Sequence, residues 1–263
     1  MEPNFSLEGK VIVVTGGTGV LGGAFVEGIA VAGGVVGILG RNEKIANERA
    51  NAINQKGGQA LALIADVTNE SQLEAACQQM LTAFGKIDGL VNNAALVERS
   101  TLDAETPESI ERTLQVNLKA PFFLIQAAYK ELVKNKGSVL NIGSVNAYAG
   151  ESTLLAYSIS KGAMQTMTRN LANAQGVNGV RVNQINPGWV LTEREDRDQV
   201  KKGLEPGWHQ RLEREAIPSG AMTTSAQMGE AAIYWLSDES KPFTGSVVDL
   251  EQFSIIGRNP EKL

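Results

Sequence analysis

Near its amino terminus the chain reads VIVVTGGTGVLGGAF (residues 11–25), and this segment narrows the choice of folds more than any other. Its first five residues are apolar and mostly β-branched, which is typical of a strand buried on both faces. A glycine-rich turn follows and leads into a segment that predicts a helix. Such a turn places free backbone N–H groups and the positive end of the helix dipole together, where they bind phosphate. Since plain tight turns contain as many glycines, the motif alone leaves both interpretations open.

The same pattern continues along the chain. Apolar runs predict buried parallel strands at residues 11–15, 35–39, 60–65, 90–92, 138–142, 181–185 and 246–250, and helix-length segments separate the first six. Thr68 and Thr106 are predicted to cap helices, the latter with Pro107 at the first helical position. This alternation predicts right-handed βαβ units in an α/β fold, with a doubly wound parallel sheet of about seven strands and helices on both faces.

The chain is expected to form a single domain over residues 1–263, because no linker or repeat interrupts the pattern. Only residues 193–220 are irregular, and we expect them to form either an active-site lid or a partly helical insertion. Most charges of that segment are expected to lie on a solvated face.

Composition excludes several classes of function. The net charge of −5 argues against nucleic acid or an anionic membrane as the main partner. One cysteine (Cys77) and one histidine (His209) cannot form a transition-metal cluster, so no metal site is expected. The first ten residues do not read as a signal peptide and no apolar run approaches the ~20 residues that span a bilayer, so we expect a soluble, cytoplasmic protein.

A second motif lies far downstream, in NIGSVNAYAGESTLLAYSISKGA (residues 141–163). Tyr157 and Lys161 are four residues apart and share one face of a helix. An ammonium group beside a phenol lowers its pKa, as proton exchange between an alcohol and a ketone requires. Ser144, at the end of a predicted strand, can hydrogen-bond the same substrate oxygen. The Tyr-x-x-x-Lys pair also arises by chance, so it does not identify an enzyme by itself.

The glycine turn TGGTGVLG resembles the T-G-x-x-x-G-x-G turn of the short-chain dehydrogenase/reductase family. Thr15, Gly16 and Gly22 match the pattern, whereas Val20 replaces its middle glycine. Gly19, one place earlier, is expected to supply the missing flexibility.

Further motifs carry the resemblance over residues 7–257. NNAA (residues 92–95) is similar to the N-N-A-G motif of the family, Asn117 matches its helix asparagine, and NPGWVLTE (residues 186–193) matches its Pro-Gly turn. The resemblance implies a Rossmann fold and an oxidoreductase that acts on CH–OH groups with NAD(P).

The resemblance also implies catalytic roles. Tyr157 would pass the proton, Ser144 would orient and polarise the carbonyl oxygen, and Lys161 would hold the nicotinamide ribose. Asn117 would anchor a water molecule that continues the proton relay.

NADP(H) is the predicted cofactor, with NAD(H) possible. Gly40 stands where NAD-preferring members have an aspartate, and Arg41 can grip a 2′-phosphate, although it could also be a solvated residue at a helix start. The residues expected to bind the cofactor are Gly16, Thr18, Val20, Leu21, Arg41, Asn42, Asp66, Val67, Asn93, Ala94, Ala95, Tyr157, Lys161, Pro187, Gly188, Val190 and Thr192.

The expected substrate is a small polar molecule, namely a sugar, a sugar acid or a polyol, because residues 193–220 resemble longer substrate loops in the family. The residues expected to contact it are Ser144, Asn146, Trp189, Trp208 and His209. The carboxyl end has Glu251-Gln252-Phe253 where the family has Asp-Gly-Gly. The family also implies a homo-oligomer, either tetramer or dimer. A 3-oxoacyl thioester reductase and a non-catalytic nucleotide-binding regulator remain as alternatives.

Overall fold

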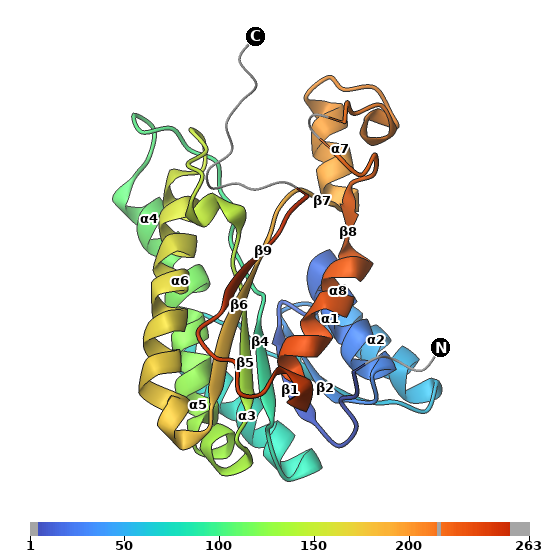
Figure 1. Ribbon diagram of the computed structural model, residues 1–263, viewed down its shortest axis with the longest axis vertical. Coiled ribbons are helices and arrows are strands. Elements are labelled where there is room, and N and C mark those ends of the chain that lie inside the picture. Colours follow the sequence, from blue (N-terminus) through green and yellow to red (C-terminus); the bar gives the residue numbers. More distant parts are fainter. Residues whose placement is uncertain (1–4, 215–216, 253–263) are drawn as a thin grey trace.

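The structure is a computed structural model that describes residues 5–214 and 217–252. Within those residues seven parallel strands form one sheet in the order β3-β2-β1-β4-β5-β6-β9 (Figure 1). The strands are β1 (Val11–Thr15), β2 (Val35–Gly40), β3 (Gln59–Ile64), β4 (Gly89–Asn92), β5 (Ser138–Ile142), β6 (Arg181–Pro187) and β9 (Val247–Leu250). The predicted sheet is confirmed, and each predicted strand differs from the observed one by at most two residues at an end.

Two helical layers cover the sheet because side chains of a strand alternate between its faces. On β1, Ile12 and Val14 point into one core while Val11 and Val13 point into the other. The first core is covered by α1 (Val20–Val31), α2 (Glu43–Gln55) and α8 (Ser225–Leu236), and the second by α3 (Glu70–Phe84), α5 (Ala120–Asn135) and α6 (Leu155–Gln175) (Figure 1). Other helical segments are α4 (Pro107–Leu114), a π-helical turn (Gln115–Lys119) and 3₁₀ turns at Val145–Ala147, Gly176–Asn178, Trp208–Gln210 and Asp238–Ser240.

One of the two predicted helix caps is correct. Thr106 caps α4, and Pro107 is the first helical residue. Helix α3, however, begins after Asn69, whose side chain accepts a hydrogen bond from the first turn. The prediction of Thr68 as the cap is wrong because its hydroxyl donates to Asp66 Oδ1 at 2.7 Å instead.

Where the structure describes it, at residues 193–214 and 217–220, the irregular segment is partly helical, which is one of the two forms expected. Helix α7 (Glu193–Lys201) lies between two short strands, β7 (Val190–Leu191) and β8 (Thr223–Thr224), which pair in parallel. Trp208, Ile217 and Met222 form a separate small core beneath the segment. In Figure 1 the insertion extends beyond the end of the sheet at which β6 ends.

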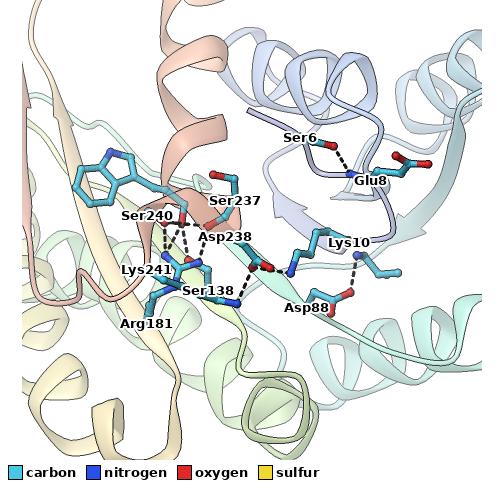
Figure 2. A network of polar contacts seen from close by, with 12 residues as sticks. Ser6, Glu8, Lys10, Asp88, Ser138, Arg181, Ser237, Asp238, Ser240 and Lys241 are labelled. Carbon is cyan, nitrogen blue, oxygen red and sulfur yellow. Dashed lines mark hydrogen bonds and ion pairs between the residues drawn. The ribbon is translucent and has the colours of Figure 1, made fainter. Parts of the chain in front are cut away.

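Polar contacts fix the opposite, amino end of the sheet (Figure 2). Arg181, at the start of β6, is 5% exposed and donates to the carbonyl oxygens of Trp235 at 3.1 Å and Ser237 at 2.9 Å. The guanidinium thereby satisfies carbonyls at the carboxyl end of α8, where a cation is favoured. Nearby, Lys10 Nζ lies 2.8 Å from Asp238 Oδ1.

No helix in residues 5–214 and 217–252 is both long and apolar enough to cross a membrane. The same part of the chain holds no group of three or more His, Cys, Asp or Glu side chains placed to bind a metal ion.

Candidate active site

A cleft of about 950 Å³ follows the carboxyl ends of the central strands, the edge at which parallel α/β sheets bind ligands. It brings together most of the predicted site residues. Those that line it are Gly16, Thr18, Val20, Leu21, Arg41, Asp66, Val67, Asn93, Ala94, Ala95, Ser144, Tyr157, Lys161, Pro187, Gly188, Trp189, Val190 and Thr192. The predicted residues Asn42, Asn117, Asn146, Trp208 and His209 are not part of its lining.

Close backbone approaches shape the glycine turn. Gly16 has a φ of +64°, and a Cβ atom there would lie 2.9 Å from Asn93 Nδ2. A Cβ on Gly22 would lie only 2.1 Å from the carbonyl oxygen of Gly16. The hydroxyl of Thr15 accepts hydrogen bonds from the N–H groups of Asn93 and Ala94, both at 3.0 Å. The turn after β1 and the loop after β4 are therefore locked to each other.

Val20 is the first residue of α1, and its exposed side chain lines the cleft. The expectation that Gly19 supplies extra flexibility is wrong, because its φ of −78° and ψ of 177° suit any residue. The N–H groups of Thr18 and Val20 find no acceptor in the part of the chain that the structure describes. Free donors at a helix start, in a turn whose close approaches require glycine at Gly16 and Gly22, fit the phosphates of a dinucleotide.

At the far end of the cleft, Gly40 ends β2 and leaves space for a neighbouring side chain. A Cβ on Gly40 would lie 2.7 Å from Thr18 Oγ1. The guanidinium of Arg41 is exposed, and its NH1 atom is 3.8 Å from Asp66 Oδ2. Hydrogen bonds from Thr68 lower the pKa of Asp66, and the charge of Arg41 adds a smaller effect. A carboxylate and an exposed arginine thus lie side by side where the adenosine end is expected.

Ser144, Tyr157 and Lys161 meet at the carboxyl end of β5. Tyr157 and Lys161 are one helical turn apart on α6, and Ser144 follows β5. The side chain of Ser144 lies close enough to Tyr157 to favour its ionised form. Lys161 is 1% exposed, and its Nζ lies 5.6 Å from the ring centre of Tyr157 and donates to the carbonyl oxygen of Ile142 at 2.7 Å.

Burial dominates the pKa values of this group. It raises the pKa of Tyr157, and the nearby side chain of Ser144 opposes that increase without cancelling it. Burial also lowers the pKa of Lys161 to about 8. The expectation that Lys161 lowers the pKa of Tyr157 is therefore wrong for this structure, because the ammonium is directed at the carbonyl of Ile142.

Asn117 lies behind the catalytic helix, in the π-helical turn Gln115–Lys119. It is fully buried, and its Oδ1 accepts a hydrogen bond from the N–H of Leu96 at 2.7 Å. Its Nδ2 donates to the carbonyl oxygen of Leu96 at 3.0 Å and to Ser160 Oγ at 2.9 Å. Asn117 thus joins the loop after β4 to α6, next to Lys161.

The predicted substrate contact of Trp208 is wrong, because the indole is buried in the small core of the insertion. It stacks on Trp189 with ring centres 5.3 Å apart, and its Nε1 donates to Asp196 Oδ1 at 3.0 Å. His209 meets the edge of Trp208 at 5.8 Å. Of these three aromatic side chains, only that of Trp189 lines the cleft.

Asn42 and Asn146, which also lie outside the lining, take part in local contacts. Asn42 caps α2, where its Oδ1 accepts a hydrogen bond from the N–H of Ile45 at 3.1 Å, so its assignment to the cofactor is not supported by its position. The backbone N–H of Asn146 donates to Ser144 Oγ at 3.2 Å.

The unusual carboxyl-terminal motif closes the Pro-Gly turn. Glu251 Oε2 accepts a hydrogen bond from the N–H of Trp189 at 2.9 Å. A Cβ on Gly188 would lie 1.8 Å from that oxygen, so the glycine and the glutamate depend on each other. Phe253, the third residue of the motif, lies outside the described residues.

Sequence reasoning missed three arginines that line the cleft: Arg112, Arg194 and Arg197. Arg112 is paired with Glu98, and Arg194 NE is 3.6 Å from Asp198 Oδ2. The spacing of Arg194 and Arg197, three residues apart on one helix, was a signal that could have identified them.

Comparisons with known proteins agree with this geometry. The family model described as "short chain dehydrogenase" matches residues 10–202. A Thermotoga maritima protein described as an uncharacterized oxidoreductase is 30% identical over 92% of this chain and 95% of its own length. The 2-dehydro-3-deoxy-D-gluconate 5-dehydrogenase of Dickeya dadantii is 28% identical over 94% of this chain and 96% of its own length.

Among solved structures, a gluconate 5-dehydrogenase from Burkholderia cenocepacia, in complex with NADP and tartrate, superimposes with a TM-score of 0.85 at 28% identity. The match covers 95% of this chain and 96% of the other. The fold and the site therefore define a Rossmann-like oxidoreductase that acts on CH–OH groups. The chain belongs to the short-chain dehydrogenase/reductase family, whose members bind NAD(P).

Proposed function

We propose that this chain is an NADP(H)-dependent oxidoreductase that interconverts a secondary alcohol and a ketone on a small polar substrate, with a sugar acid as the leading candidate. The observation that carries the proposal is the meeting of Ser144, Tyr157 and Lys161 in the cleft that the glycine turn also lines. The gluconate 5-dehydrogenase described with NADP and tartrate supports both the nucleotide and the substrate class.

The nicotinamide would supply hydride transfer to or from the carbinol carbon. Tyr157, whose pKa burial raises, keeps its proton at neutral pH and donates it from Oη to the substrate oxygen during reduction. The Ser144 hydroxyl orients the same oxygen. In oxidation Tyr157 accepts the proton, so that direction becomes faster as pH rises. Lys161 would hold the nicotinamide ribose, and Asn117 would anchor the relay water behind α6.

Arg41 is proposed to select NADP(H). Its exposed guanidinium lines the cleft beside Gly40, which has no carboxylate of its own to repel a 2′-phosphate, and it lies 3.8 Å from the carboxylate of Asp66. The side chain of Thr18 fills the space next to Gly40 and presents a hydroxyl there. The guanidinium of Arg41 and the neighbouring hydroxyl can both donate hydrogen bonds to a phosphate group.

The arrangement of charges on α7 favours a sugar acid over a neutral polyol. Two of its acidic residues accept hydrogen bonds from indoles: Glu195 Oε1 accepts from Trp189 Nε1 at 2.8 Å, and Asp196 accepts from Trp208. Arg194 and Arg197 line the cleft together with Glu195, whose Oε1 also accepts a hydrogen bond from Gln199 Nε2 at 2.8 Å. A guanidinium at the substrate end would bind a carboxylate through charge-assisted hydrogen bonds.

The test is nicotinamide absorbance change across sugar acids, their matched polyols and the corresponding ketones, each with NADP(H) and NAD(H). We expect turnover with sugar acids and NADP(H). Arg197→Met should raise KM for the sugar acid about tenfold and leave that of the matched polyol unchanged. Equal effects on both would refute carboxylate recognition. Activity confined to 3-oxoacyl thioesters, or nucleotide binding without any turnover, would support the two alternatives instead.

A further inference from the structure

Arg49, on α2, contacts the glycine turn from outside the cleft. Its NH1 group donates to the carbonyl oxygen of Gly17 and, at 2.8 Å, to that of Gly19. The side chain is half-buried, and it is not part of the cleft lining. Arg49 therefore contacts the turn without reaching the space in which a ligand would lie.

Gly23 provides the space for this arginine. A Cβ atom on Gly23 would lie 2.5 Å from the Cζ atom of Arg49 and equally close to NH1. Gly23 lies inside α1, where glycine is a poor helix former, so its presence there has no local advantage. The space that the Arg49 guanidinium needs explains why residue 23 is a glycine.

The two carbonyls that Arg49 binds belong to peptide units whose N–H groups are those of Thr18 and Val20. In a planar trans peptide, C=O and N–H point in opposite directions. Holding the carbonyl of Gly17 therefore directs the N–H group of Thr18 away from Arg49. The carbonyl of Gly19 also accepts from the N–H of Gly23 at 2.9 Å, so Arg49 and α1 together direct the N–H group of Val20. Neither donor has an acceptor in the described residues, which is also true of the N–H groups of Leu21 and Gly22, and all four residues line the cleft.

We propose that Arg49 is a positioning residue that sets the two peptide planes of the glycine turn and so prepares their N–H groups to bind the cofactor's phosphates. The inference rests on the proposed use of a dinucleotide. It also explains how the turn works with Val20: the path is fixed by a side chain from α2 rather than relaxed by additional glycines. The positive charge behind the turn favours the same anion.

A purely structural role, in which Arg49 only joins α1 to α2, predicts different measurements. We would compare wild type, Arg49→Met, Gly23→Ala and the double variant. The NADPH dissociation constant would come from nucleotide fluorescence, and Tm would be measured without nucleotide. KM and kcat would follow on the substrate that the panel identifies.

Arg49→Met is expected to weaken NADPH binding and raise its KM by about tenfold or more, because two charge-assisted hydrogen bonds are lost, while kcat at saturating nucleotide changes by less than about twofold. Gly23→Ala displaces the guanidinium but improves the helix, so it should weaken binding by a similar factor while Tm stays equal or rises. In the double variant the alanine should have no additional effect on binding, because no guanidinium remains to be displaced.

Unchanged NADPH affinity in Arg49→Met with a lowered Tm would overturn the proposal and leave a structural contact. Additive losses in the double variant would also overturn it, since Gly23 would then act independently of Arg49. If the wild-type chain bound neither NADPH nor NADH, the proposed function itself would fail, and this inference with it.

Discussion

Replacing Lys161 with methionine should stabilise the fold while it removes activity. Lys161 is 1% exposed, and burial lowers its pKa from the 10.5 of an ordinary lysine to about 8. At neutral pH the folded protein thus carries a buried ammonium. A pKa difference of this size corresponds to about 3 kcal/mol of unfavourable free energy.

The replacement also has a cost. It leaves the carbonyl oxygen of Ile142 without the donor that lies 2.7 Å away, which is worth about 1 kcal/mol. The net gain at pH 7 is therefore about 2 kcal/mol, or about 5 °C in Tm.

The pH dependence has a definite sign. Between pH 8 and 10.5 the unfolded chain binds a proton at Lys161 that the folded chain has lost, so the stability of the wild type rises with pH in that window. The advantage of Lys161→Met should shrink to near zero by about pH 10, where only about 1 kcal/mol of the penalty remains.

The assay is thermal unfolding of both proteins without nucleotide at pH 7 and pH 10. Lys44→Met serves as the control, because that lysine is 83% exposed on α2 and its replacement should not alter Tm. A Lys161→Met variant less stable than wild type at pH 7, or a difference that does not change with pH, would refute the reasoning.

Two further predictions concern the cofactor and the proton. Arg41→Ala should raise KM for NADPH about tenfold and leave that for NADH unchanged, as paired steady-state assays would show; equal changes would mean that Arg41 is only a solvated residue. Because burial raises the pKa of Tyr157, kcat/KM for alcohol oxidation should increase with pH above neutrality while that for ketone reduction does not; a flat oxidation profile between pH 7 and pH 10 would contradict this assignment.

The sequence predicts the sheet well because its strands are buried on both faces. Runs such as residues 11–15 and 138–142 are apolar throughout, and both strands occupy those same bounds in the structure. Thr106 was identifiable as a cap from the proline that follows it. The sequence did not exclude Thr68 as a cap. Its hydroxyl donates a hydrogen bond to Asp66 in a local turn, and that turn competes with capping.

The sequence predicts which residues form the candidate site, but it does not predict their pKa values. Motif spacing placed Ser144, Tyr157 and Lys161 in one cleft. It could not show that the ammonium of Lys161 faces the carbonyl of Ile142, which leaves burial to raise the pKa of Tyr157. Contacts between segments that are distant in sequence could not be predicted either, because motif spacing carries no information about them.

Two such contacts show the limit. Arg49 reaches the glycine turn from a different helix, and Glu251 reaches Gly188 from the position after the last strand. From the sequence alone, Arg49 and Glu251 cannot be distinguished from ordinary surface residues, because only the folded structure shows that each lies against a glycine. The glycines at positions 23 and 188 were the available signals, because neither is required by its own backbone conformation.

The central claim is that Tyr157 transfers the proton in a nicotinamide-dependent reaction. The most direct measurement compares wild type with Tyr157→Phe for NADPH binding and for NADPH-dependent ketone reduction under the same conditions. The account predicts unchanged NADPH affinity and a loss of kcat of at least about a hundredfold in the variant. Retention of wild-type turnover by Tyr157→Phe, with NADPH bound equally well, would contradict it.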